Sequence, residues 1–265
     1  MILLLLPLFA VHEDLELQIS RITRQIEREP DRALLYFRRA ELHRLHEDWA
    51  AAREDLARAA ARDPKLEAVD LALGRVCNQS GESARAKEAL DRFLARNPDH
   101  VEARIERARA RTRLGDAAGA VEDYTSAIAR MDEPWAQNYL ERSEVLRSAG
   151  RLDEAIRGLE EGLRKIGPAL PIQLALLDLE LEAGRVDPAL TRLAEISAAS
   201  DRKDLWLVRR GEILRQASRR TEASRAFQEA IAAIEALPVS RRRTKFTRDL
   251  EQKARAGWEA THAQP

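Results

Sequence analysis

The sequence predicts an all-α fold, a solenoid of about six stacked helical hairpins, because three residue types recur along it at one period. Prolines lie 34 residues apart at Pro30, Pro64 and Pro98. Glycines recur every 34 or 35 residues, at Gly81, Gly115, Gly150 and Gly184. Alanines keep the same spacing, at Ala52, Ala86, Ala120, Ala155, Ala189 and Ala223. A fixed period of this length indicates a repeat architecture in which each unit stacks on its neighbours.

Each period contains two runs of helical spacing separated by a turn. In the second unit, the apolar residues of 67–80 follow a helical pattern that ends at Gly81, a residue that adopts the left-handed conformation found just past a helix. A second run then places Ala86, Leu90 and Phe93 on one face, and Pro98 follows it, where a helix cannot continue. Each unit is therefore expected to be a helical hairpin.

The recurring alanine predicts a close crossing of the two helices in each hairpin. A larger residue lies four positions later and is expected to fill the gap beside the crossing: Leu56, Leu90, Tyr124, Leu159, Leu193 and Phe227. Acidic residues recur where the second helix starts, at Asp48, Glu82, Asp116, Asp153 and Asp187. A negative charge is favourable at that end of a helix because the helix dipole is positive there.

A helical hairpin of 34 residues, with small residues at its eighth and twentieth positions and proline near its end, resembles the tetratricopeptide repeat. Six such repeats cover residues 33–237, with starts near 33, 67, 101, 136, 170 and 204. The eighth positions are Ala40, Gly74, Ala108, Ser143, Leu177 and Gly211. The resemblance implies a right-handed α-solenoid whose first helices line a concave, peptide-binding groove.

The sequence departs from this pattern in three ways. Leu177 is large where a small residue is expected, so the fifth repeat matches least well. Glu47 and Ser218 replace the turn glycine. Arginine replaces the usual aliphatic seventh residue in four repeats, at Arg39, Arg107, Arg142 and Arg210.

Both ends of the array are expected to carry capping helices, which cover the apolar face of a terminal repeat. Residues 12–30 predict an N-terminal half-repeat with Ile22 and Ile26 on its buried face. Residues 238–265 predict a C-terminal capping helix and tail, with four residues facing the core: Phe246, Leu250, Ala254 and Trp258.

Residues 1–11 are uncharged and apolar, as in the core of a signal peptide. A helix of this length is about half the ~30 Å hydrocarbon thickness, so no stable membrane span is expected. We expect export to the periplasm or the cell exterior. The alternatives are an apolar N-terminal stub and a cytoplasmic protein, since no Lys or Arg precedes the apolar run.

Composition argues against several classes of function. The 265 residues carry 45 basic and 45 acidic side chains, so net charge demands no nucleic-acid partner. The single cysteine, Cys77, excludes an internal disulfide and any multi-cysteine metal site. His43 and His46 alone fall short of a metal site. We find no catalytic motif, and therefore predict no enzymatic activity, no cofactor, no metal site and no catalytic residue.

The candidate binding surface is the predicted groove. Its fifth positions form an apolar stripe that includes Phe37, Leu71, Ile105 and Leu140, although these side chains would equally serve to pack adjacent hairpins. Its charged residues are Glu41, Arg75, Arg109, Arg113, Glu144 and Arg147. The three arginines Arg75, Arg109 and Arg113 form a candidate basic centre for a carboxylate-bearing ligand.

The functional hypothesis is a non-enzymatic scaffold that binds a peptide segment or a partner protein in this groove. Two alternatives remain open, a structural or assembly subunit of an envelope complex and an accessory domain of a separately encoded enzyme. The oligomeric state is not predicted.

A basic run near the C-terminus is interpreted as a solvated face of the capping helix, balanced by Asp249 and Glu251. It comprises Arg241, Arg242, Arg243, Lys245 and Arg248. Binding to phosphate groups or to an anionic membrane is therefore the less favoured interpretation. A nucleic-acid site would also need aromatic residues beside the cations, and the one at hand, Phe246, is assigned to the core.

The alanine register makes a direct prediction. Ala86→Leu is expected to overpack the second hairpin and destabilise the protein by about 1–3 kcal/mol. The measurement is the melting temperature of the full chain, and an unchanged value would contradict the register.

Overall fold

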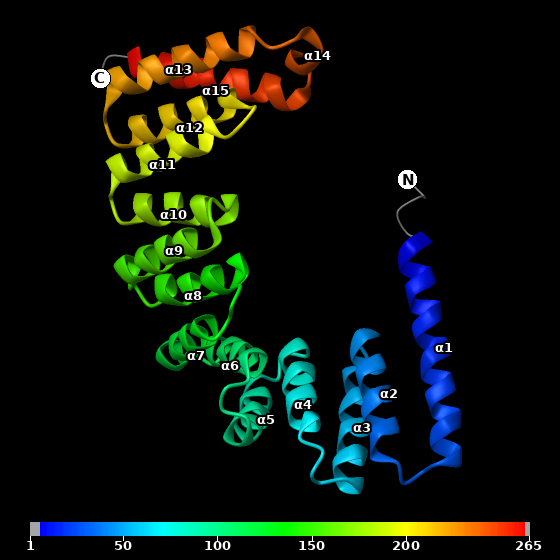
Figure 1. Cartoon of the computed structure of the whole chain (residues 1–265). Coiled ribbons are helices and arrows are strands. Elements are labelled where there is room, and N and C mark those ends of the chain that lie inside the picture. Colours follow the sequence, from blue (N-terminus) through cyan, green and yellow to red (C-terminus); the bar gives the residue numbers. More distant parts are fainter. Residues whose placement is uncertain (1–5, 263–265) are drawn as a thin grey trace. The chain divides into compact units, whose positions relative to one another are not determined.

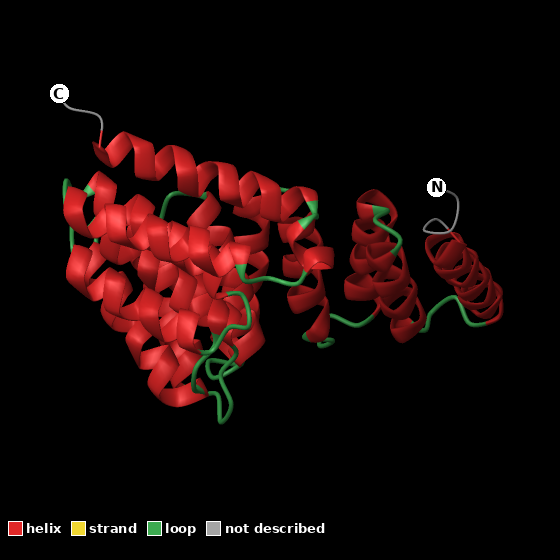
Figure 2. Cartoon of the chain, turned by 90° about the horizontal axis from the view of Figure 1, so that it is seen from above, coloured by secondary structure: helices red, strands yellow, loops and turns green. Residues whose placement is uncertain are grey.

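A computed structural model describes residues 6–262, with side chains described for residues 14–261; in this part of the chain the secondary structure is helical only (Figure 1, Figure 2). The predicted fold class is therefore confirmed. The chain divides into two compact units, Met1–Pro134 and Trp135–Pro265.

The first unit contains a leading helix and three hairpins. The leading helix is α1 (Leu6–Arg28), and it packs against α2. The hairpins are α2 (Ala33–Leu45) with α3 (Trp49–Arg62), α4 (Ala68–Gln79) with α5 (Ser83–Arg96), and α6 (Val101–Arg113) with α7 (Ala117–Ala129). The first helix of a hairpin contacts both helices of the preceding one, as α4 does with α2 and α3.

The second unit contains three more hairpins and a trailing helix. The hairpins are α8 (Ala136–Ser148) with α9 (Leu152–Ile166), α10 (Leu170–Glu182) with α11 (Val186–Ala198), and α12 (Lys203–Gln216) with α13 (Arg220–Glu235). A short α14 (Val239–Arg242) leads into α15 (Lys245–His262), which packs on α12 and α13.

The recurring alanines mark the tightest point of every hairpin. All six are fully buried: Ala52, Ala86, Ala120, Ala155, Ala189 and Ala223. The larger residues four positions later are also buried, and each side chain of this size stabilises the fold by about 1.5–3 kcal/mol. A Cβ atom added to Gly74 would lie 2.5 Å from Leu90 Cγ, which explains why the eighth position is small.

The six turns within hairpins share one geometry, including the two that lack glycine. Glu47 and Ser218 have φ values of 62° and 61°, in the left-handed region where Gly81 also lies. In each turn the backbone N–H that follows this residue bonds the carbonyl five positions earlier, as Asp48 does with His43 at 2.9 Å. This bond satisfies a carbonyl that the end of the helix leaves free.

The acidic residues at the start of the second helices have two roles. Asp48 and Asp116 are N-caps, whose carboxylates accept the N–H groups of Ala51 and Gly119 at 3.1 and 3.0 Å. Asp153 and Asp187 pair with an arginine of the next repeat, as Asp153 does with Arg185 at 2.6 Å, whereas Glu82 pairs with Arg53 of the preceding one. The caps stabilise single helices, whereas the pairs connect neighbouring repeats.

The seventh-position arginines join consecutive hairpins in the first unit. Arg39 donates two hydrogen bonds to Asp55 at 2.6 and 2.7 Å and a third to Thr23 Oγ1 at 3.0 Å. Arg107 likewise bonds Asp123 at 2.7 and 2.8 Å and Asp91 at 2.8 Å. We call this arrangement the arginine clamp: one guanidinium bound to its own second helix and to the preceding one. Its hydrogen bonds raise the pKa of both arginines.

The seventh-position arginines of the second unit, Arg142 and Arg210, form longer contacts than those of the first unit. Arg142 reaches the Gly158 carbonyl at 3.4 Å and Glu161 at 3.3 Å, and Arg210 lies 3.7 Å from Glu229. The fifth repeat has Leu176 at its seventh position, and Arg192 of α11 instead bonds the buried Glu180 of α10 at 2.6 and 3.0 Å. The oversized Leu177 packs with Ala189 and Leu193, so the least regular repeat still closes as a hairpin.

The predicted capping helices are present, with one error in the predicted core. Ile22 and Ile26 of α1 pack against the first core cluster, and Leu250 and Ala254 of α15 are buried. Phe246, assigned to the core by its spacing, is 53% exposed. It lies in the first turn of α15, whereas the buried residues of this helix, Leu250 and Ala254, lie further along.

The predicted leader, residues 1–11, falls partly outside the described residues. Residues 1–5 are not described, and residues 6–11 belong to the first part of α1. Among the described helices, none combines the length and the apolar character that crossing a membrane requires.

The arginine clamp makes a quantitative prediction. Asp123→Ala leaves Arg107 without its main partner and removes a 2.9 Å bond from Arg111. Because the Asp123 carboxylate is almost fully buried, the expected loss is about 3–5 kcal/mol, measured by thermal denaturation of the full chain.

The matched control for Asp123 is Glu54→Ala, which breaks the exposed pair between Glu54 and Arg58. That change is expected to cost at most about 1 kcal/mol. Equal losses in the two variants would contradict a structural role for the clamp.

Candidate functional site

The predicted groove residues of the first unit lie on its three first helices. Phe37 and Glu41 are on α2, and Leu71 and Arg75 are on α4. The remaining three are on α6: Ile105, Arg109 and Arg113. These helices contact one another in sequence, α2 with α4 and α4 with α6, so the structure brings the residues onto adjoining helices.

The apolar members of this set serve mainly to pack the hairpins. Leu71 and Ile105 are each only 8% exposed, and Leu71 belongs to a core cluster with Leu90 and Phe93. Phe37 is half-buried against the N-terminal core. In the first unit, these side chains therefore pack adjacent hairpins together and do not form an open apolar surface.

The candidate basic centre is a mixed network of charges. Arg75 pairs with Glu102, and Arg109 pairs with Glu106 at 2.8 Å. Asn78 donates to the Glu106 carboxylate at 2.6 Å and accepts a hydrogen bond from Arg113 at 3.3 Å. The arginines thus lie among carboxylates and an amide, and the sequence could not show the pairing of Arg75 on α4 with Glu102, which lies on α6.

Arg113 is the member of this network that is most available to a ligand. Its side chain is exposed, and it forms no ion pair with any side chain of residues 14–261. At the other end of this surface, Glu41 pairs with Arg44 at 3.2 Å, and Arg44 donates to Gln79 of α4 at 3.3 Å.

The predicted groove residues of the second unit lie on α8. Leu140 is half-buried, whereas Glu144 and Arg147 are exposed. Arg147 donates to Glu182 of α10 at 2.6 Å and lies 3.7 Å from Glu144. Hydrogen bonding to Glu182 raises the pKa of Arg147. This arginine connects the first helices of neighbouring repeats.

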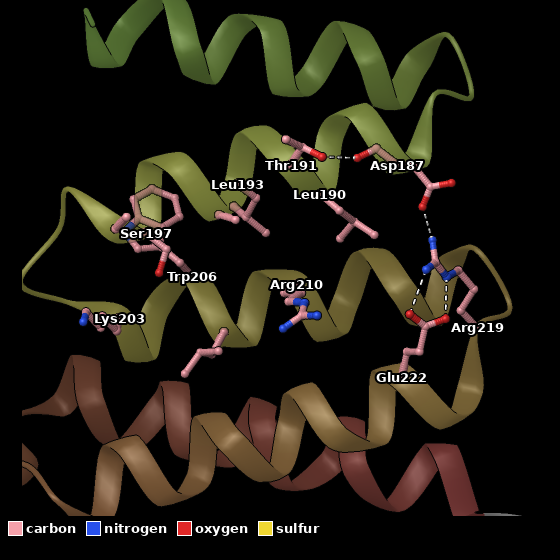
Figure 3. A pocket seen from close by; sticks show the side chains of 13 residues that line it. Asp187, Leu190, Thr191, Leu193, Ser197, Lys203, Trp206, Arg210, Arg219 and Glu222 are labelled. Atoms are coloured by element: carbon pink, nitrogen blue, oxygen red, sulfur yellow. Dashed lines mark hydrogen bonds and ion pairs between the residues drawn. The ribbon is translucent and has the colours of Figure 1, made fainter.

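The second unit also contains a pocket that the sequence analysis did not predict. It has a volume of about 640 Å³ and lies between α11 and α12, with the start of α13 at one end (Figure 3). Its apolar wall is formed by Leu190, Leu193, Trp206 and Leu207. Trp206 projects from α12 toward the end of α11 where Ser197 lies (Figure 3).

The two ends of this pocket differ in their charges. At one end Arg219 joins Asp187 to Glu222, with two hydrogen bonds of 2.7 Å to Glu222 (Figure 3). These bonds hold the pKa of Glu222 below its usual value. At the other end Lys203 forms no ion pair within residues 14–261, and Arg210 between the ends has only a long pair to Glu229. The middle of the pocket and the end at Lys203 are therefore positive.

The apolar residues that line the pocket are visible in the sequence, but their pattern did not predict a binding site. Trp206 and Leu207 follow one another near the start of a first helix, and Leu190 follows the fully buried Ala189. The predicted ligand contacts all lie on first helices, at the fifth and ninth positions and, for Arg113 and Arg147, about one turn further along. A pocket between a second helix and the next first helix lies outside that rule.

The residues considered for chemistry remain separate in the structure. His43 lies 3.9 Å from Asp48 and from Asp55, and His46 lies 3.9 Å from Glu16. Over residues 14–261 there is no group of three His, Cys, Asp or Glu side chains that could hold a metal ion. Cys77 is buried with Ala86 and Ala110, and burial raises the pKa of its thiol, which opposes nucleophilic use.

Comparison with known proteins agrees with this fold. Residues 71–134 match the family model of the tetratricopeptide repeat. No curated protein matches the chain.

Several solved structures share the fold at low sequence identity. The C-terminal part of a TPR repeat-containing protein from Cytophaga hutchinsonii has a TM-score of 0.68 at 14% identity, over 92% of this chain and 96% of that one. A tetratricopeptide repeat protein from Parabacteroides merdae has a TM-score of 0.58 at 17% identity, over 93% and 94%. PilW, a type IV pilus biogenesis factor, has a TM-score of 0.59 at 16% identity, over 72% and 88%.

The similar structures establish the fold, and the family model identifies residues 71–134 as tetratricopeptide repeats. Tetratricopeptide repeats generally mediate interactions between proteins. The repeats recognised at 71–134 include α5, α6 and α7, and the hairpins on either side share their period, turn geometry and buried alanines. The chain is an α-solenoid that contains tetratricopeptide repeats over residues 71–134.

Proposed function

We propose that this protein is a non-enzymatic scaffold that binds a peptide segment of a partner protein, with the pocket between α11 and α12 as an anchor point. The observation that carries the proposal is the composition of that pocket. An apolar wall of Leu190, Leu193, Trp206 and Leu207 lies beside two cations, Lys203 and Arg210, that no nearby carboxylate neutralises at short range.

This combination fits a segment in which an apolar side chain lies near an acidic one. The apolar side chain would gain about 25 cal/mol for each Å² buried against the wall. The acidic side chain would pair with Lys203 or Arg210, and such charge complementarity contributes to specificity. At the opposite end of the pocket, Asp187, Arg219 and Glu222 already pair with one another. We therefore expect the charged contact with the segment to form at Lys203 or Arg210.

The face formed by α4 and α6 is a second contact surface in this proposal. Arg113 on this face is exposed and forms no ion pair within residues 14–261. An acidic group of the partner would pair with this arginine. The apolar fifth positions of this unit, by contrast, are already used in packing.

The peptide-binding proposal is tested by selecting displayed random peptides on the immobilised full chain. We expect enrichment of peptides with an acidic residue near an aliphatic or aromatic one. The double variant Lys203→Glu/Arg210→Glu should bind a selected peptide at least about tenfold more weakly, because like charges then face each other.

The control is Arg157→Glu/Arg164→Glu, which makes the same charge change on exposed positions of α9 and should leave the affinity unchanged. Equal affinity of the Lys203→Glu/Arg210→Glu variant and the wild type would exclude the pocket as the anchor. Failure to enrich any peptide would contradict peptide binding.

We also propose that the protein is exported, on the basis of the uncharged apolar residues 1–11. Expression of the full sequence with a C-terminal tag, followed by fractionation and N-terminal sequencing, tests this. An exported product that begins near Val11 is expected, whereas an intact Met1 in the cytosol would overturn the proposal.

A further inference from the structure

The connection between the last hairpin and the trailing helix carries a dense group of cations. Arg241 and Arg242 lie in α14, Arg243 follows it, and Lys245 and Arg248 lie in the first turn of α15. All five side chains are exposed. We call these five residues, together with the exposed Val239 and Phe246, the basic corner.

The charges of the basic corner are not balanced by the acidic residues nearby. Glu251, expected from the sequence to offset them, instead pairs with Arg255 at 2.7 Å, and Glu235 pairs with the same arginine at 2.9 Å. Within the described side chains, none of the five cations forms an ion pair, and Asp249 forms none either. Five positive charges within eight residues therefore face solvent, and Asp249, directly after them, is the one carboxylate beside them that is not in an ion pair.

Two apolar side chains lie exposed within the same segment. Val239 and Phe246 are each 53% exposed. The Arg202 guanidinium lies 5.2 Å from the centre of the Phe246 ring and is paired with Asp204 at 2.7 Å. Phe246 is therefore displayed at the surface beside the cations, and not in the core as the sequence predicted.

The backbone of the basic corner is held in one conformation. Thr244 Oγ1 accepts the Thr247 N–H at 3.3 Å and bonds Thr247 Oγ1 at 3.0 Å, while Thr247 is fully buried. The N–H groups of Arg241 and Arg242 bond the Pro238 carbonyl at 2.9 and 3.0 Å. The cations and the two apolar side chains are thus displayed from a fixed turn, so that less backbone entropy is lost on binding.

Clustered cations beside exposed apolar side chains match the chemistry of an anionic lipid surface. Lys and Arg are attracted to lipid phosphates, and apolar and aromatic side chains enter the interfacial layer. Single-stranded nucleic acid is recognised by several aromatic rings on which bases stack, and the basic corner offers one. We propose that the basic corner binds peripherally to the surface of an anionic phospholipid membrane.

This proposal is independent of the peptide-binding pocket and is tested by vesicle co-sedimentation. The full chain should bind vesicles of equal parts phosphatidylglycerol and phosphatidylcholine, and should not bind vesicles of phosphatidylcholine alone. Binding should weaken as salt is raised, because exposed charges are screened. Arg241→Gln/Arg242→Gln/Arg243→Gln should reduce the affinity about a hundredfold, at about fivefold for each cation near the surface.

Two further variants separate the contribution of Phe246 from that of the cations, and a specific effect of the basic corner from a general effect of net charge. Phe246→Ser should also weaken binding to the anionic vesicles, with an unchanged dependence on salt. The control Arg157→Gln/Arg164→Gln/Arg225→Gln removes the same charge from exposed positions of α9 and α13 and should bind as the wild type does. Melting temperatures show whether each variant is folded.

Three outcomes would overturn the proposal. The first is a wild type that does not sediment with the anionic vesicles, and the second is a control that loses as much affinity as the Arg241→Gln/Arg242→Gln/Arg243→Gln variant. The third is tight binding to a single-stranded oligonucleotide without vesicle binding, which would assign the basic corner to nucleic acid.

Discussion

The close approach of two helices at a fully buried alanine is the constraint on which each hairpin depends. Ala86 shows why, since it lies in a small cluster with Cys77 and Ala110 that joins its own hairpin to the first helix of the next. The second helix can then insert a large side chain opposite a small eighth residue, as Leu90 does against Gly74 and Phe227 against Gly211. Hairpin closure and hairpin stacking therefore both follow from the same few small residues.

Polar groups connect the hairpins once this apolar geometry is in place. The arginine clamp requires a carboxylate 16 residues beyond the arginine, a condition met by Arg39 with Asp55 and by Arg107 with Asp123. A buried pair of this kind contributes little net stability, but loss of one partner leaves a charge without compensation. The clamp thus favours correct stacking of neighbouring repeats more than it adds to their stability.

Much of the fold could be predicted from the sequence because period, turn residues and helix spacing are local properties. The hairpins, the left-handed turns at glycines such as Gly81, and the buried large residues follow from them, whereas the same turns at Glu47 and Ser218 were not predicted. Side-chain partners were not predictable in the same way. The pairing of Arg75 with Glu102 depends on the relative rotation of two helices, and the exposure of Phe246 depends on where α15 first meets α13. The candidate pocket was missed for the same reason, since it is formed by residues of three helices.

The short reach of the contacts has a consequence for how the chain folds. Side-chain hydrogen bonds between repeats join positions about one repeat apart, as Arg147 and Glu182 are. Chains dominated by such near-neighbour contacts fold fast and can nucleate at any repeat. Each compact unit also has hairpins and core clusters of its own, so unfolding need not be cooperative over the whole length. A ligand bound to a single unit would stabilise that unit directly.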